Sequence, residues 1–135
     1  MIVLDSSFLL AYHNSTDVHH PAAARTMVRL LGGEWGRALL LEYVFLEVVT
    51  VVLARRGAAL ASEVAGQLLA AAELEFVPCS PLFAETLHQF RAQVDRRLSF
   101  TDAAIVAVAT RQAPGYVATF DADFTAVDGV TVVPG

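Results

Sequence analysis

The sequence predicts an α/β fold in which helices cover a parallel sheet. Short apolar runs of strand length alternate with helical patterns along the chain. The predicted strands are apolar on both faces, which is typical of a parallel sheet with a helical layer on each side. No linker, low-complexity tract or internal repeat divides the 135 residues. We therefore expect a single domain over residues 1–135.

The first elements follow from the beginning of the chain. The run MIVL predicts a strand over Ile2–Leu4, and Asp5 or Ser6 can cap a helix that starts near Ser7. The later strands are predicted from similar apolar runs at Ala38–Leu41, Leu74–Val77, Tyr116–Thr119 and Val130–Val133. The helices are predicted at Ser7–Tyr12, Ala22–Leu31, Tyr43–Arg56, Ala59–Ala72, Pro81–Arg91 and Asp102–Gln112.

Cysteine content and hydropathy indicate a soluble, cytoplasmic protein. The lone Cys79 cannot form an internal disulfide, and no signal-peptide pattern precedes the first strand. The apolar stretch from Ala38 to Ala54 is almost long enough to cross a bilayer, but Glu42 and Glu47 interrupt it. We therefore expect no membrane association.

The chain has more apolar surface than one modest core requires. Its hydrophobic fraction is 56% and its mean hydropathy is +0.54, so we expect a protein partner or a homodimer. The net charge of -5 argues against broad electrostatic binding to nucleic acid. All nine basic side chains are Arg, and those beside the acidic segments, including Arg97, suit phosphate contact. Genome base composition explains an Arg-rich, Lys-free chain equally well.

Four acidic residues occupy positions that an ordinary core would reject. Asp5 ends the run MIVL, and Glu47 lies inside LLLEYVFLEVVTVV. Asp102 opens AAIVAVA, and Asp121 follows YVATF. Carboxylates at the border of a core are unfavourable unless a cation meets them. If the four converge, carboxylate oxygens favour a hard ion such as Mg²⁺ or Mn²⁺, which predicts an enzyme acting on phosphates.

Each acid also has a structural alternative. Asp5 can cap a helix, Asp102 fits a capping box with Ser99, and Asp121 fits a turn. Glu47 lies on a mostly apolar helical face, where pairing with an Arg would account for it. Glu42, at a strand-to-helix junction, is explained by the helix dipole alone.

The order MIVLDSS, FLEVVTVVLARR, LSFTDAAIVA and ATFDADF resembles the PIN domain of VapC-type toxins over essentially the whole chain, and DVHHPAAA adds to the match. The resemblance implies a Mg²⁺- or Mn²⁺-dependent ribonuclease, a toxin restrained by a VapB-type antitoxin, and a sheet in the order 3-2-1-4-5. That order places Asp5 beside Asp121. The family's acidic set falls on Asp5, Glu47, Asp102 and Asp121, with Asp123 as an auxiliary, and Asp5 and Asp102 as the foremost metal ligands.

The resemblance also assigns hydroxyl and basic groups to substrate contact. Ser6 and Thr119 match the family's small hydroxyl residues, and Arg97 is a candidate for the RNA backbone. Related toxins often carry Thr or Ser at the end of the second strand, where this chain has Leu41 and Glu42. Hydroxyl contacts to substrate are therefore not expected at that point.

The expected reaction is hydrolysis of an RNA phosphodiester by metal-activated water. Two other functions stay open: a phosphoacceptor signalling domain, which would normally need a Lys that this chain lacks, and a catalytically silent interaction module. A zinc site built from His13, His19 and His20 is a weaker alternative, because their spacing matches no common structural site.

Overall fold

The computed structural model describes residues 1–95 and 97–135. Five short strands alternate with helices: β1 (Ile2–Leu4), β2 (Ala38–Leu41), β3 (Leu74–Val77), β4 (Gly115–Ala118) and β5 (Val130–Val133). The α-helices are α1 (Ser6–Tyr12), α2 (His20–Leu31), α3 (Glu42–Arg56), α4 (Ala58–Ala70), α5 (Phe83–Ala92) and α6 (Phe100–Ala109). Two 3₁₀ turns, η1 (Ser80–Leu82) and η2 (Ala122–Phe124), complete the described elements.

The strands form one parallel sheet in the order β3-β2-β1-β4-β5, which confirms the order implied by the resemblance. At the centre, Val3 pairs with Leu39 of β2 and with Val117 of β4. The strand order reverses at β1: the chain adds β2 and β3 on one side of β1 and then adds β4 and β5 on the other side. In such sheets the ligand site lies beyond the carboxyl ends of the strands at this switch in order.

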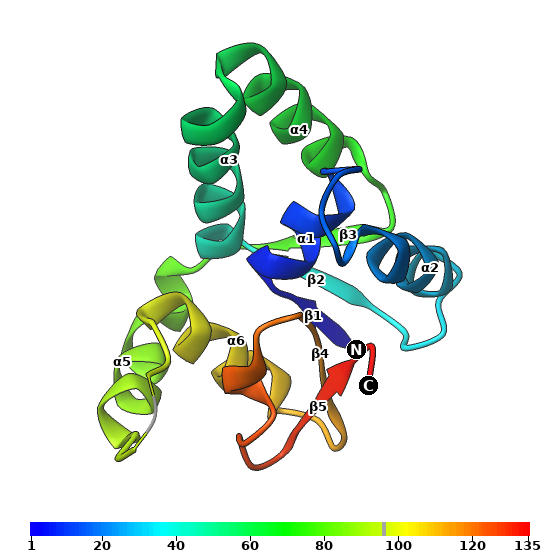
Figure 1. Ribbon diagram of the computed structural model, residues 1–135. Helices are drawn as coiled ribbons and strands as arrows, with labels where there is room; N and C mark the ends of the chain where they lie inside the picture. Colours follow the sequence, from blue (N-terminus) through cyan, green and yellow to red (C-terminus); the bar gives the residue numbers. More distant parts are fainter. Residues whose placement is uncertain (96) are drawn as a thin grey trace.

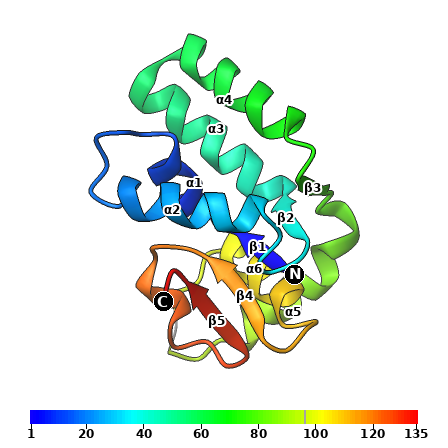
Figure 2. The same ribbon diagram turned by 90° about the vertical axis from the view of Figure 1, so that its right-hand side faces the viewer.

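Helices cover both faces of the sheet, so the predicted α/β class is confirmed (Figure 1). Helix α1 packs against α2 and α3, and α3 packs against α4. On the other side α5 packs against α6, which contacts β1 and β4. A quarter turn shows α1 to α4 together above the strands, with α5 and α6 beside β4 (Figure 2).

The core is built from fully buried aliphatic strand residues and from α6. Every residue of β1 and β2 is buried, as expected for central strands covered on both faces. The segment from Ala103 to Ala109 is buried throughout, because α6 lies between the sheet and α5. None of the described helices is long and apolar enough to span a bilayer.

Element boundaries differ from the prediction by a few residues. Strand β4 starts and ends one residue earlier than expected, which leaves Thr119 just beyond the strand. Helix α6 begins at Phe100 because Ser99, rather than a later residue, is its N-cap. The segment predicted as one helix from Pro81 instead begins with η1 and becomes α-helical at Phe83.

Candidate active site

The candidate site lies where β1 and β4 end side by side. Leu4 pairs with Ala118, and the Asp5 N–H donates to the Ala118 carbonyl at 3.0 Å. Asp5 is therefore fixed next to the segment that carries Thr119 and Asp121, as the strand order predicts. Both segments leave the sheet at the edge expected for a ligand site.

Asp5 is the most deeply buried of the predicted acids, with only 3% of its surface exposed. It occupies the N-cap position of α1, yet its side chain makes no capping hydrogen bond. Its Oδ2 atom instead accepts hydrogen bonds from Ser7 Oγ and Thr119 Oγ1, both at 2.7 Å. The capping explanation for Asp5 is therefore wrong, because the carboxylate is held by hydroxyls from two segments.

Glu47 lies in α3 and contacts the first helix through a hydroxyl. Ser6 Oγ donates a short hydrogen bond to Glu47 Oε1. No Arg of the described chain forms an ion pair with Glu47, so Arg pairing does not account for it there. Glu47 also lines an open hollow of about 380 Å³, together with Tyr43, Leu46, Thr50, Val51 and Thr101. The hollow lies between α3 and the start of α6, so the Glu47 carboxylate is accessible to solvent and to a ligand.

Asp102 has a structural role and an electrostatic one. It forms the predicted capping box: its Oδ2 accepts from the Ser99 N–H, and its own N–H donates to Ser99 Oγ, both at 3.0 Å. Its pKa is nevertheless raised from 3.8 to about 6. Burial is the largest cause, and the negative charges of Asp5 and Asp121 act in the same direction, whereas the hydrogen bonds from Ser99 oppose it. Asp102 therefore senses two of the other predicted acids.

Asp121 and Asp123 form the turn after β4. Asp121 Oδ1 accepts from the Asp123 N–H at 2.9 Å, so the predicted turn function of Asp121 is present. The Asp121 N–H donates to Thr119 Oγ1 at 2.9 Å, which connects this turn to the group that holds Asp5. Asp123 is exposed in the first turn of η2, and its auxiliary role stays a prediction.

The arrangement of the carboxylates fits a hard cation that keeps several of its waters better than one coordinated entirely by protein ligands. Among the described residues, no group of three His, Cys, Asp or Glu side chains is gathered closely enough to hold an ion by itself. The described ion pairs are Arg29–Glu34, Arg37–Glu75 and Arg111–Glu85, and none involves the predicted acids. Mg²⁺ keeps several waters and commonly uses only one or two carboxylates. A set of oxygen donors that repel one another and lack a described cationic partner matches that chemistry.

The remaining predicted groups have clear locations. Ser6 and Thr119 are both buried and direct their hydroxyls at carboxylates, so their contact with substrate stays a prediction. Arg97 is exposed just before the start of α6. Glu42 accepts a hydrogen bond from the Cys79 N–H at 2.9 Å, a structural contact that agrees with its assignment outside the site. His19 stacks on Phe120 with ring centroids 4.5 Å apart.

Ser7 belongs to the site although no sequence motif indicated a role for its side chain. Its hydroxyl donates to Asp5 and accepts from the Phe120 N–H at 3.0 Å. The repeated hydroxyl in Asp5-Ser6-Ser7 was visible in the sequence. Its partner at residue 120 was not, because that contact joins segments 113 residues apart.

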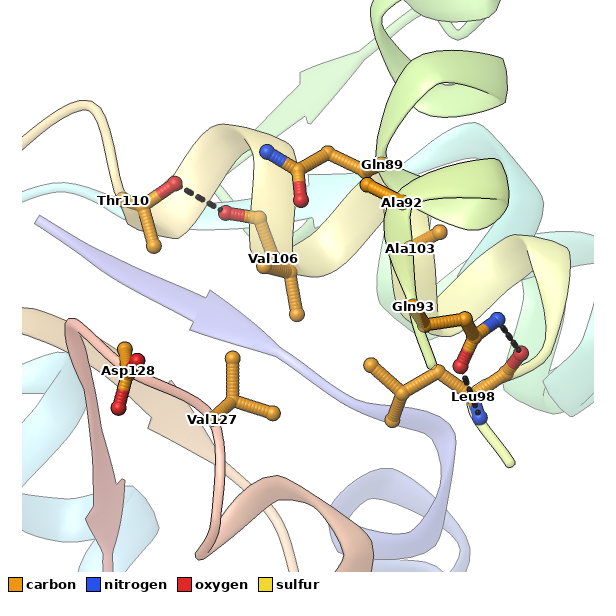
Figure 3. A pocket seen from close by; sticks show the side chains of 9 residues that line it. All are labelled: Gln89, Ala92, Gln93, Leu98, Ala103, Val106, Thr110, Val127 and Asp128. Atoms are coloured by element: carbon orange, nitrogen blue, oxygen red, sulfur yellow. Dashed lines mark hydrogen bonds between the residues drawn. The ribbon is translucent and has the colours of Figure 1, made fainter. Parts of the chain in front are cut away.

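A separate cavity of about 290 Å³ lies between α5, α6 and the loop before β5. Figure 3 shows its lining, which contains none of the predicted acids: Gln89, Ala92, Gln93, Leu98, Ala103, Val106, Thr110, Val127 and Asp128. The Gln93 amide bonds both the N–H and the carbonyl of Leu98 at 3.0 Å, and Thr110 Oγ1 donates to the Val106 carbonyl at 2.7 Å. Because none of the predicted acids lines this cavity, it is not the candidate site.

Comparison with known proteins identifies the family. The PIN domain family model matches residues 2–130, so the chain belongs to the PIN domain family. The fold is similar to that of Mycobacterium tuberculosis VapC20, whose crystal structure is described as that of a sarcin-ricin loop cleaving toxin. The two have a TM-score of 0.79 and 23% sequence identity, over 93% of this chain and 94% of that chain. Comparison with curated proteins gave no significant match.

Proposed function

We propose that this protein is a Mg²⁺- or Mn²⁺-dependent endoribonuclease that hydrolyses RNA phosphodiesters. The observation that carries the proposal is the environment of Asp5. This carboxylate is 3% exposed, has no described cationic partner, and raises the pKa of Asp102 together with Asp121. Buried negative groups that repel one another become favourable when a cation lies between them. Membership of the PIN family supports the same chemistry.

We assign Asp5 and Asp102 as the principal metal ligands. Glu47 and Asp121 complete the ligand shell through water or orient the attacking water, and Asp123 is an auxiliary acid. A bound divalent ion supplies a water of lowered pKa and positive charge opposite the phosphate. Asp102 must lose its proton to bind a cation, so its raised pKa makes binding pH-dependent.

Other residues position the RNA and the acids. The open hollow beside Glu47 gives the scissile phosphate access between α3 and the start of α6. Arg97 is exposed just before α6, which supports its proposed contact with the RNA backbone. The hydroxyls of Ser6 and Thr119 hold Glu47 and Asp5 in place from within.

We also propose that the protein is the toxin of a VapBC-type toxin–antitoxin pair and forms a homodimer. The likeness to VapC20 supports the first part. Large apolar side chains such as Leu46 and Phe83, each 54% exposed, support the need for protein partners. Induced expression in bacteria is expected to arrest growth, and the Asp5→Asn variant is expected not to. Equal growth arrest by both forms would contradict a nuclease toxin that depends on Asp5.

The activity itself is tested with purified protein, single-stranded RNA and Mn²⁺, with and without a chelator. Wild-type protein is expected to cut RNA only when the metal is available, and Asp5→Asn is expected to fold without cutting. Asp128→Asn, at an exposed loop position, is the matched control and should cut normally. If wild-type protein leaves a broad set of RNAs intact with Mn²⁺, the chain is a silent interaction module. Cleavage by Asp5→Asn at the wild-type rate would refute the assigned ligand set.

A further inference from the structure

The two oxygens of the Asp5 carboxylate have different surroundings. Oδ2 accepts two hydrogen bonds of 2.7 Å, from Ser7 and Thr119. Among the described residues, Oδ1 accepts a single hydrogen bond, a long one from Ser6 Oγ at 3.5 Å. The single Ser6 proton is directed at Glu47, to which Ser6 makes a much shorter contact. Oδ2 is therefore saturated by protein donors, while Oδ1 keeps its lone pairs for another ligand.

A carboxylate oxygen only accepts hydrogen bonds, so the Asp5 carboxylate determines which way the two hydroxyls donate. Ser7 Oγ accepts from the Phe120 N–H at 3.0 Å, and Thr119 Oγ1 accepts from the Asp121 N–H at 2.9 Å. Each hydroxyl has one proton, and each is 2.7 Å from the same carboxylate oxygen. The 3.1 Å contact between the two hydroxyl oxygens is longer than the contact of either with the carboxylate, which is the stronger acceptor, so each proton is assigned to Asp5. Both hydroxyls thus act as donors to Asp5.

We propose that Ser7 is a positioning residue that, with Thr119, fixes the Asp5 carboxylate and leaves Oδ1 as the oxygen that would bind a cation. This inference rests on the proposed nuclease function. Ser7 contributes what the strand pairing alone does not, because its side chain connects α1 to the backbone of residue 120. Groups that orient metal ligands in this way typically change affinity or activity by about 10- to 100-fold when removed.

The test uses Mn²⁺ binding measured by electron paramagnetic resonance, with RNA cleavage as a second measurement. Ser7→Ala is expected to bind Mn²⁺ and cut RNA about 10- to 100-fold less well than wild type. Ser7→Thr keeps the hydroxyl and is expected to restore most of both. Ser62→Ala, another helical Ser→Ala change at an exposed position of α4, is the matched control and should behave as wild type.

A merely structural serine would lower the melting temperature of Ser7→Ala and leave its Mn²⁺ affinity unchanged, which would overturn the inference. If Ser7→Ala does not fold, Ser7→Cys fills nearly the same space with a much weaker donor and is expected to show the same loss. Mn²⁺ binding by Ser7→Cys within twofold of wild type would also overturn it. Wild-type protein that neither binds Mn²⁺ nor cuts RNA would instead refute the proposed function and this inference with it.

Discussion

Neutralising Asp102 is expected to stabilise the metal-free fold. The pKa of this carboxyl rises from 3.8 to about 6, so the folded state disfavours its charged form. A rise of this size corresponds to at most about 3 kcal/mol at neutral pH. Asp102 is only half-buried, and solvent screening reduces the expected gain for Asp102→Asn to about 1–2 kcal/mol. The Asn side-chain oxygen can still accept from the Ser99 N–H, so the helix cap is retained.

The stability gained by Asp102→Asn is expected to depend on pH. The folded-state pKa of Asp102 lies above its unfolded value, so the charged carboxylate destabilises the fold above about pH 6. As the pH falls from about 6 to about 4, the wild-type side chain takes up a proton in the folded state and the penalty decreases. The advantage of Asp102→Asn should therefore be full near pH 7.5 and reduced to about a third near pH 4.5.

Urea denaturation in the presence of chelator measures this difference directly. Wild type, Asp102→Asn and the exposed control Asp128→Asn are compared at pH 7.5 and at pH 4.5. Asp128→Asn is expected to stay within about 0.5 kcal/mol of wild type at both values. The electrostatic account of the site is refuted if Asp102→Asn is no more stable than wild type at pH 7.5, or if its gain is the same at both pH values.

Two further predictions concern metal affinity and backbone packing. Because Asp102 must be deprotonated to bind a cation, Mn²⁺ affinity should fall as the pH drops below about 6, by up to about tenfold per pH unit. Calorimetric titration between pH 5 and 8 checks this, and an affinity independent of pH would argue against Asp102 as a ligand. Gly115→Ala would place a Cβ 2.6 Å from a backbone oxygen and is expected to destabilise the fold by about 2 kcal/mol or more in thermal melts. The matched change Gly66→Ala meets open space in α4 and should stabilise by about 0.5–1 kcal/mol, so equal effects of the two would contradict the packing described for β4.

The strands were largely predictable from the sequence because each is marked by the hydrophobicity of a few consecutive residues. Four of the five strands have the predicted bounds, since each is a short apolar run bordered by a clear change in character. Strand β4 was predicted one residue late because Gly115 has no apolar side chain. Gly115 still pairs with Val130. A side chain at Gly115 would meet the backbone oxygens of Ala109 and Gly129.

The candidate site was predictable in its residue types but not in its contacts. The four acids and the capping box of Ser99 and Asp102 were predicted from sequence motifs. The capping box is present in the structure. The hydrogen bond from Thr119 to Asp5 spans 114 residues, and the contact from Ser6 to Glu47 spans 41. Periodicity contains no information about such pairings, because they depend on which strands become neighbours.

The departure from expectation lies in how the acids are held. A tight cluster of carboxylates would have required each to point at a common centre. Instead Asp102 caps α6, Asp121 closes the turn of η2, and Glu47 bonds Ser6. Local donors would compete with a cation for each carboxylate, so the proposed ion is a hydrated one that needs few protein ligands.

The effect of Mn²⁺ on the thermal stability of wild-type protein and of Asp5→Asn at pH 7.5 shows whether the carboxylates around Asp5 bind a metal ion. A cation that binds only the folded state stabilises it by about 2.7 kcal/mol at one hundred times its dissociation constant. If Asp5 is a metal ligand, the melting temperature of wild type rises with Mn²⁺ concentration, and this rise is lost in Asp5→Asn. The same rise in both proteins, or no rise in wild type, would contradict the claim that the carboxylates around Asp5 form a metal site.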